Sequence, residues 1–151
     1  MTSETATHFL NVDLDVKSRA NLAPLVGRME RRAVVLHSDR RRGVHSARFE
    51  LLGTRQGTPD QCIAGLARLI EDLPAAERGL WDEASARIFD IGIQAGADGQ
   101  VFKLKIKAAT LERVAAARRR RRRRRPTEFA IRAAERPRSS RTRVGVNRVA
   151  A

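Results

Sequence analysis

The stretch His8–Val16, HFLNVDLDV, determines how the fold of this 151-residue chain is interpreted. Every second side chain from Leu10 to Val16 is aliphatic, and polar side chains stand between them. A period of two over nine residues predicts a β-strand with one apolar and one polar face. Because the polar face stays in contact with water, helices are expected to cover only one side of the sheet, which favours antiparallel or mixed strand pairing.

Four more runs have the composition of strands. They form two pairs, and turn-forming residues lie between the two runs of each pair. The strands are expected at residues 33–37, 44–52, 88–95 and 101–107, and the turns at 38–43 and 96–99. Each turn contains glycine beside polar residues, a composition typical of β-hairpins. The sequence therefore predicts two hairpins in addition to the first strand.

Four segments carry apolar residues at helical spacing. They are expected to form helices at residues 19–30, 59–73 and 74–84 and from Thr110 onward. Ser18 is the predicted N-cap of the first helix. Thr58-Pro59-Asp60 predicts the start of the second helix, because it combines a capping hydroxyl, a proline at the first helical position and an acid in the first turn.

These elements follow one another in the order β-α-β-β-α-α-β-β-α. The order predicts an α+β fold: a two-layer sandwich with a mostly antiparallel sheet and helices on one face. One domain accounts for residues 1–117, a length typical of a single core. Residues 118–151 lack sustained periodicity and are predicted to form a disordered basic tail.

The formal net charge of +14 is distributed unevenly. Residues 118–151 contain 14 of the 31 Lys and Arg residues and two of the 17 acidic residues, so residues 1–117 carry 17 basic against 15 acidic side chains. The body of the protein is therefore nearly neutral. One cysteine and 42% hydrophobic residues exclude a disulfide scaffold, a collagen-like chain and a polytopic membrane protein.

Eight consecutive arginines follow Ala117, and they have two interpretations. They are Arg118, Arg119, Arg120, Arg121, Arg122, Arg123, Arg124 and Arg125. Such a run binds nucleic-acid phosphates through counterion release, with little sequence preference. The other interpretation is a shifted reading frame, because GCG alanine codons read one base out become CGG arginine codons.

Four segments of the body share a pattern with other sequences: VDLDVKSR at 12–19, LPAA leading to LWD within 73–82, FDIGIQAG at 89–96 and TLERVA at 110–115. In these segments the chain resembles a set of uncharacterised small bacterial α+β proteins, over about residues 8–117. Members of that set continue after the last helix into a closing strand that ends near a tyrosine, whereas this chain has the arginine run there. In size and fold the set is similar to immunity-type proteins of bacterial toxin systems, and the resemblance implies no named activity.

The polar face of the predicted sheet is the main candidate binding surface. Oxygen-bearing side chains at i, i+2 and i+4 of the first strand could bind a hard cation or a basic partner. The alternative is a solvated face with cross-strand ion pairs. The residues expected on this partner-binding face are Asn11, Asp13, Asp15, Arg48, Glu50, Asp90 and Gln94. If the strand at 101–107 neighbours the others, Lys103, Lys105 and Lys107 share the same face.

Two smaller groups lie at the first predicted hairpin. His37 and His45 flank its turn and could lie across from each other, beside Asp39, as the beginning of a zinc site. The alternative is that both are ordinary histidines, since the sequence places no third ligand. Arg40–Arg42 at the tip could bind an acidic partner or keep an exposed turn soluble.

Catalytic signatures are absent from the sequence: it has no G-x-S-x-G, Walker A, H-E-x-x-H, C-x-x-C or G-x-G-x-x-G motif. Cys62 and Trp81 lie in apolar helical stripes and are expected in the core. An enzyme that uses the carboxylates of Asp13, Asp15 and Asp90 is the third hypothesis, after a binding module and a nucleic-acid-associated protein.

The sequence as a whole predicts a cytosolic bacterial protein that binds another protein without catalysis and without a cofactor or metal. Nucleic-acid binding through the arginine run is the alternative. The N-terminal residues lack the basic and apolar regions of a secretory signal, and no apolar run approaches the ~18 residues of a membrane span, so no membrane attachment is expected.

Overall fold

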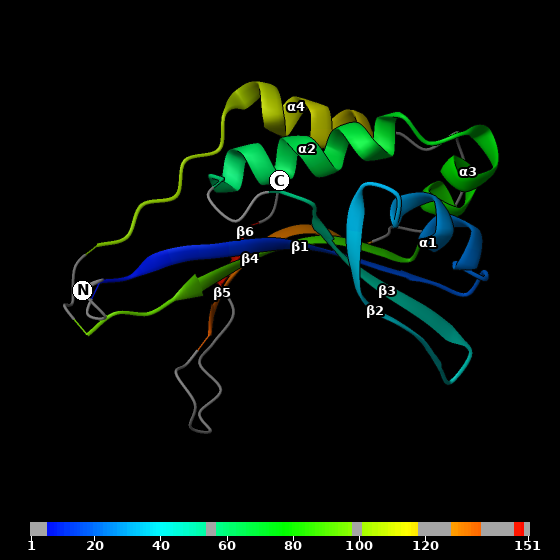
Figure 1. The fold of residues 1–151 in the computed structure, drawn as a ribbon, viewed down its shortest axis with the longest axis horizontal. Helices are drawn as coiled ribbons and strands as arrows, with labels where there is room; N and C mark the ends of the chain where they lie inside the picture. Colours follow the sequence, from blue (N-terminus) through cyan, green and yellow to red (C-terminus); the bar gives the residue numbers. More distant parts are fainter. Residues whose placement is uncertain (1–5, 54–56, 98–100, 118–127, 137–146, 150–151) are drawn as a thin grey trace.

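The computed structural model describes residues 6–53, 57–97, 101–117, 128–136 and 147–149. Its elements are β1 (His8–Ser18), α1 (Ala23–Met29), β2 (Ala33–Arg41), β3 (Val44–Leu51), α2 (Pro59–Glu71), α3 (Ala75–Glu83), β4 (Ala86–Gln94), α4 (Ala108–Ala117), β5 (Glu128–Arg136) and β6 (Asn147–Val149). The strands form one sheet in the order β2-β3-β1-β4-β5-β6. In Figure 1 the helices lie above this sheet.

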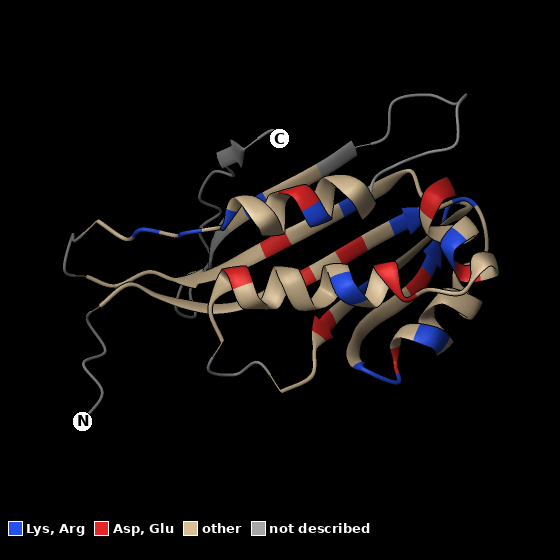
Figure 2. Ribbon diagram, turned by 90° about the horizontal axis from the view of Figure 1, so that it is seen from above, with Lys and Arg blue, Asp and Glu red and all other residues tan. Residues whose placement is uncertain are grey.

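The expected α+β class and the mostly antiparallel sheet are confirmed. Every neighbouring pair of strands is antiparallel except β4 and β5, which run parallel. None of the helices among the described residues is long and apolar enough to span a membrane. Figure 2 shows that acidic and basic residues are interspersed over the described helices and strands, in agreement with the small net charge of residues 1–117.

The main core lies between the sheet and the helices. The aliphatic face of β1 packs there against α2, as the period-two pattern predicts. Cys62 and Trp81 are each 1% exposed in this core, so both expectations of burial are confirmed. A smaller apolar cluster of Ala86, Ile88 and Ala130 joins β4 to β5.

The helix α2 begins as the sequence predicts. Thr58 Oγ1 accepts a hydrogen bond from the backbone N–H of Gln61 at 3.2 Å, and the Gln61 side chain accepts one from the backbone N–H of Thr58 at 2.9 Å. This reciprocal capping box satisfies two donors that have no partner within the helix. It fixes the start of the helix that covers the centre of the sheet.

The first helix is shorter than expected, and Ser18 is not its cap. The helix α1 begins at Ala23, with Leu22 as its N-cap residue. Ser18 is instead the last residue of β1, and its hydroxyl accepts a hydrogen bond from the backbone N–H of Ala20 at 3.1 Å. Serine is common both at helix N-caps and in tight turns, and Ser18 forms a turn here.

The first hairpin also differs in its turn. The strand β2 continues to Arg41, so the turn contains only Arg42 and Gly43 instead of residues 38–43. Both have positive φ, 49° and 77°, which is the geometry of a two-residue type I′ turn. The residues from Ser38 to Arg41 therefore belong to the sheet.

The predicted strand at 101–107 is wrong. These residues alternate between exposed and partly buried, but they form no strand, and the segment leads into α4 (Figure 1). Leu104 and Ile106 pack against the main core, and the backbone N–H of Lys107 donates a 2.9 Å hydrogen bond to Asp60 on α2. Alternating apolar and polar residues show only that one side of a segment is buried. Here the buried side chains cover the core, and the backbone does not pair with a strand.

The sequence predicts no packed structure after residue 117, yet two parts of that region pair with the sheet. The strand β5 pairs with β4 over nine residues, from Glu128 opposite Ala86 to Arg136 opposite Gln94. The strand β6 pairs with β5. Residues 118–127, 137–146 and 150–151 lie outside the described residues.

Candidate functional site

The side of the sheet opposite the helices, which we name the open face, carries the polar side chains of β1. Strand register places Asp13 opposite Glu50 of β3 and opposite Asp90 of β4. It also places Asp15 opposite Arg48 of β3. Residues opposite one another on one face of a sheet lie within reach of side-chain contact. Four carboxylates and the Arg48 guanidinium therefore meet at the centre of the open face.

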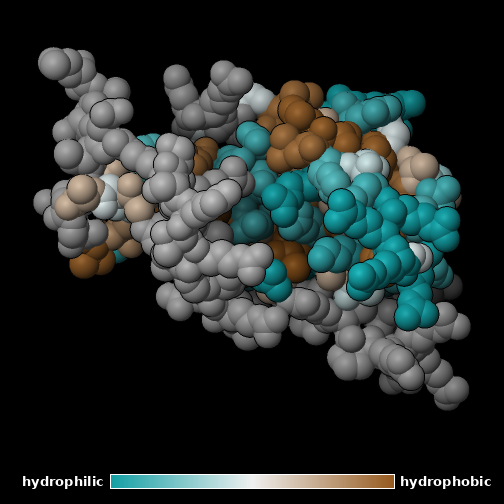
Figure 3. Space-filling model, turned by 90° about the horizontal axis from the view of Figure 1, so that it is seen from below, coloured by the Kyte–Doolittle hydropathy of each residue, from teal (hydrophilic) through white to brown (hydrophobic). Residues whose placement is uncertain are grey.

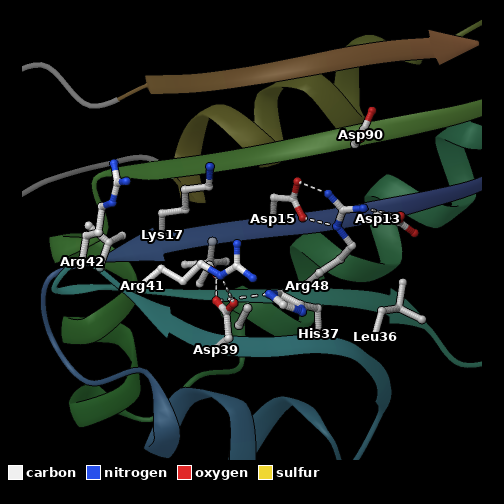
Figure 4. A pocket seen from close by; sticks show the side chains of 14 residues that line it. Asp13, Asp15, Lys17, Leu36, His37, Asp39, Arg41, Arg42, Arg48 and Asp90 are labelled. Carbon is white, nitrogen blue, oxygen red and sulfur yellow. Dashed lines mark hydrogen bonds and ion pairs between the residues drawn. The ribbon is translucent and has the colours of Figure 1, made fainter. Parts of the chain in front are cut away.

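Arg48, Asp13, Asp15 and Asp90 line a hollow of about 1070 Å³. Figure 4 shows Arg48 between Asp13 and Asp15 at its floor, with Arg41, Arg42 and Lys17 toward the hairpin end. The residues that line it are Asp13, Asp15, Val16, Lys17, Leu36, His37, Asp39, Arg41, Arg42, Val44, Ser46, Ala47, Arg48 and Asp90. Four of them are basic and four are acidic, so the hollow has no net formal charge.

Arg48 is the organising side chain of the hollow. Its guanidinium binds Asp15 through two hydrogen bonds, from Nε to Oδ1 and from Nη2 to Oδ2, the second at 2.8 Å. Its Nη1 also lies 3.8 Å from Oδ2 of Asp13. The hydrogen-bonded Asp15 carboxylate raises the pKa of Arg48 above its ordinary value. Two parallel N–H···O bonds fix the plane of the guanidinium, so this group is held in one orientation.

Asp13 lies deeper than the sequence suggests, because it is only 1% exposed. Asn11 donates from Nδ2 to Asp13 Oδ1 at 2.8 Å and to Glu50 Oε2 at 3.1 Å. Buried carboxylates require such partners, since an isolated charge away from water is costly. Asp13 therefore supports the floor of the hollow and does not face solvent.

A second set of contacts surrounds Asp39 on β2. Its Oδ1 accepts a hydrogen bond from the hydroxyl of Ser46 at 2.6 Å and lies 3.2 Å from Nε2 of His37. Its Oδ2 lies 3.4 Å from Nε of Arg41. The Ser46 hydroxyl, followed by His37 and Arg41, lowers the pKa of Asp39 below its ordinary value despite some desolvation. The wall formed by β2 and β3 is thus hydrogen-bonded across the hairpin.

The structure brings most of the predicted partner-binding residues together. Asn11, Asp13, Asp15, Arg48, Glu50 and Asp90 lie on neighbouring strands at the centre of the open face. Gln94 lies at the far end of β4, where its Nε2 is 3.5 Å from the carbonyl oxygen of Ala95. The expectation for Lys103, Lys105 and Lys107 is wrong, because their segment does not belong to the sheet.

Sequence reasoning placed neither Leu36 nor Ser46 at a candidate site, and it named Asp39 only beside the two histidines. It assigned Asp39 to a turn because Ser38–Gly43 has turn composition, whereas the strand extends to Arg41. The spacing between Asp39 and Ser46 could have predicted that these two residues pair across the hairpin. With the Arg42-Gly43 pair as a two-residue turn, these two residues fall directly opposite each other.

The predicted zinc arrangement is not present. His37 lies opposite Arg48, and His45 lies opposite Arg40 on the hairpin and Ser18 on β1, so the two histidines do not face each other. Among the described residues, His, Cys, Asp and Glu side chains nowhere form a group of three or more that could hold a metal ion. The arginines of the Arg118–Arg125 run lie outside the described residues.

The chain matches no protein-family model, no curated protein and no solved structure in the comparisons made with each. The open face is therefore the basis for assigning a function. Its hollow is lined by equal numbers of acidic and basic side chains, several of which are held by ion pairs. The hairpin beside the hollow has an exposed cationic tip.

Proposed function

We propose that this chain is a non-catalytic protein-interaction module that binds its partner through the open face. One observation carries the proposal: the hollow is lined by eight charged side chains, and its central guanidinium is fixed by Asp13 and Asp15 before any partner arrives. Charged groups that are already oriented favour specific association, because less side-chain freedom is lost on binding.

The same contacts argue against catalysis by the central carboxylates. A general acid or base must reach the proton it transfers. Asp13 is 1% exposed and bonded to Asn11, and Asp15 is occupied by two bonds from Arg48. These carboxylates stabilise the sheet, which supports a binding role over the enzymatic hypothesis.

The resemblance to small bacterial proteins with the size and fold of immunity-type proteins supports the same class of function. An immunity-type protein acts by occupying a surface of its partner and needs no reactive group. We therefore propose a cytosolic bacterial setting and a protein partner for this chain. An adjacent toxin gene on the chromosome would agree with this setting.

Matched charge reversals test the proposal. Lys17 lines the hollow and Lys103 lies on the connection to α4, and both side chains are exposed. Wild-type chain, Lys17→Glu and Lys103→Glu are used to capture proteins from nuclease-treated source cells, and each captured protein is then purified and titrated by calorimetry. We expect a partner whose affinity falls at least tenfold with Lys17→Glu and is unchanged with Lys103→Glu. Equal affinities for both variants would overturn the proposal.

The arginine run supports a second candidate, a nucleic-acid-associated protein, because eight adjacent guanidinium groups neutralise phosphates without reading sequence. Deletion of residues 118–151 would also remove β5 from the edge of β4, so substitution is the cleaner test. Replacing the eight arginines by glutamine should abolish salt-sensitive binding to a 20-base-pair duplex. Retention of that binding would overturn this candidate.

The hypothesis of a shifted reading frame concerns the same residues. Resequencing of the coding DNA tests it directly. A one-base shift near codon 117 that restores an apolar, strand-like continuation would support the hypothesis. A shifted frame without such a continuation would exclude it.

A further inference from the structure

The strand β2 forms one border of the sheet. It pairs with β3 on one side, and no strand among the described residues pairs with its other side. An edge strand presents a row of backbone N–H and C=O groups that can pair with another extended chain. The strand spans nine residues, Ala33–Arg41, and the register shift between Val35 and His37 divides it into two stretches that can pair.

The first half of this border is apolar and exposed. Val34 is 42% exposed and Leu36 is 45% exposed, although large aliphatic side chains are usually buried. Leu52, which is 53% exposed, lies across from the residue that precedes β2, because its backbone N–H donates a 3.4 Å hydrogen bond to the carbonyl oxygen of Arg32. Figure 3, seen from the side of the open face, shows hydrophobic side chains gathered beside the hydrophilic ones.

Basic residues stand at both ends of the border. Arg31 and Arg32 precede β2, and Arg40, Arg41 and Arg42 end it, all of them exposed. Asp39 is the one acidic side chain within β2, and it is bound by Ser46, His37 and Arg41. Arg32 lies 3.5 Å from the exposed Asp72. The stretch from Arg31 to Arg42 is therefore basic, apolar and basic in turn, over about 40 Å at roughly 3.3 Å per residue.

We propose that β2 is the docking edge for an extended acidic segment of the partner protein, with aliphatic side chains in its middle and carboxylates at both ends. The segment adds a further strand beside β2, places its aliphatic side chains against Val34 and Leu36, and pairs its carboxylates with the flanking arginines. Backbone hydrogen bonds supply affinity in this mode of recognition, and side chains supply specificity. This inference rests on the proposed function and names the chemistry of the partner.

A second copy of this chain fits the edge poorly. Two identical edge strands related by a two-fold axis must run antiparallel, and the register that puts Val34 opposite Leu36 puts Arg31 opposite Asp39 and Glu30 opposite Arg40. Asp39 is already bound by Ser46, His37 and Arg41, and in this register neither Arg32 nor Arg41 lies opposite an acidic residue. An acidic segment places carboxylates opposite the arginines at both ends.

A nucleic acid fits less well than a peptide. A phosphate backbone is uniformly negative, whereas the adjacent hollow is lined by Asp13, Asp15, Asp39 and Asp90 as well as by basic residues. A phosphate backbone also cannot continue the hydrogen-bond ladder of a sheet. The exposed Val34 and Leu36 add apolar area that a polyanion does not use.

Synthetic peptides test the inference with the full-length chain. The probe is a fluorescein-labelled peptide of eleven residues, DETVTVTVTED, whose acidic ends reach Arg31 and Arg41 in either orientation, and its binding is followed by fluorescence anisotropy. Its controls are the same peptide N-methylated at alternate residues, KKTVTVTVTKK, DEDEDEDEDED and a 20-base-pair duplex. We expect the probe to bind at least tenfold more tightly than every control, and to slow amide hydrogen exchange at residues 33–41. Equal binding of the N-methylated peptide, or tighter binding of the duplex, would overturn the inference.

Protein variants locate the site. Leu36→Lys and Val34→Lys should each weaken probe binding at least tenfold, whereas Leu111→Lys on α4 should not change it, since Leu111 is similarly exposed at 40%. Unchanged binding by both edge variants would overturn the inference. Light scattering of the wild-type chain between 10 and 200 μM checks for self-association, and a dimer that Leu36→Lys abolishes would assign the edge to a second copy instead.

The two proposals fail in distinguishable ways. A purified partner that is sensitive to Lys17→Glu but insensitive to Val34→Lys and Leu36→Lys would overturn the edge inference and leave the proposed function standing. A partner insensitive to Lys17→Glu would contradict the proposed function. The N-methylated control does not depend on any variant being folded, so the edge inference is tested in every case.

Discussion

The indole Nε1–H of Trp81 on α3 donates a 2.9 Å hydrogen bond to the backbone carbonyl oxygen of Ala117, the last residue of α4. Arg78, one turn earlier on α3, donates from Nη2 to the same oxygen at 3.1 Å. The last carbonyl groups of a helix have no partner within it. Two side chains of α3 therefore complete the end of α4, directly before the arginine run.

Trp81→Phe should destabilise the protein by about 1–3 kcal/mol. The variant keeps an aromatic ring in the core but loses the indole N–H and part of the ring volume. Chemical denaturation measures the change in the free energy of unfolding. Leu80→Ala on the same helix, at a partly buried position, is the control for general loss of apolar contact. A variant as stable as the wild type would show that the bond to Ala117 contributes nothing.

Asp60 should make stability depend on pH. Its carboxylate accepts hydrogen bonds from the backbone N–H of Lys107 and from Thr110, and these, the Lys107 bond first, lower its pKa below the ordinary value. The folded pKa lies below the unfolded one. The stabilisation is therefore present above the unfolded pKa, near 4, and is lost as the pH falls through the folded pKa.

Asp60→Asn tests this dependence. At pH 7 the variant should be less stable by about 1–2 kcal/mol, because a charged acceptor is replaced by a neutral one. The difference in unfolding free energy between wild type and variant should shrink as the pH is lowered toward 2.5. Glu112→Gln, at an exposed carboxyl on α4, is the control for the loss of one negative charge at pH 7. A difference that is constant with pH would contradict the assignment.

Arg48→Met should lower the free energy of unfolding by about 1–3 kcal/mol. The loss should be smaller than for a fully buried ion pair, because the Arg48 side chain is 39% exposed. The loss arises because Asp13 and Asp15 keep their charges without the guanidinium. Asp15→Asn in the same chain should recover part of the stability. Thermal unfolding of both single variants and the double variant measures the coupling, and simple additivity would exclude a direct interaction.

Arg42→Asn should stabilise the hairpin by a few tenths to about 1 kcal/mol. Arg42 has a φ of 49°, a conformation that asparagine adopts more readily than arginine, and Asn-Gly is the favoured type I′ pair. Arg41→Asn, on the strand beside it, is the matched control and should not stabilise. Differential scanning calorimetry provides the comparison. Equal effects of the two changes would indicate a charge effect instead of a backbone effect.

Local signals predicted the elements that depend on local chemistry. The alternation of His8–Val16 and the Thr58 cap specify β1 and α2, because side-chain period and cap hydrogen bonds act within a few residues. The alternation at 101–107 led to the wrong prediction of a strand, since a segment that covers the core and a strand with one buried face produce the same pattern. The strand β5 depends on pairing with β4, which no local feature encodes.

The candidate site was predictable as a set of residues but not as a geometry. Parity along the strands placed Asp15 and Arg48 on one face, whereas their direct pairing depends on the register between β1 and β3. The irregularity between Val35 and His37 shifts the register of β2, and this shift brings His37 opposite Arg48. Such shifts arise from tertiary packing and leave no signature in composition.

The position of β1 in the sheet has a consequence for the order of folding. The strand β1 precedes the other described elements in the chain, yet its neighbours in the sheet are β3 and β4. The elements α1, β2, β3, α2 and α3 all lie between β1 and β4 in the chain. Closing so long a loop costs chain entropy before the β1–β4 contacts form, and sheets built from distant pairs fold in milliseconds to seconds instead of microseconds. We expect the β2–β3 hairpin to form early and the docking of β4 onto β1 to limit the rate at which the sheet is completed.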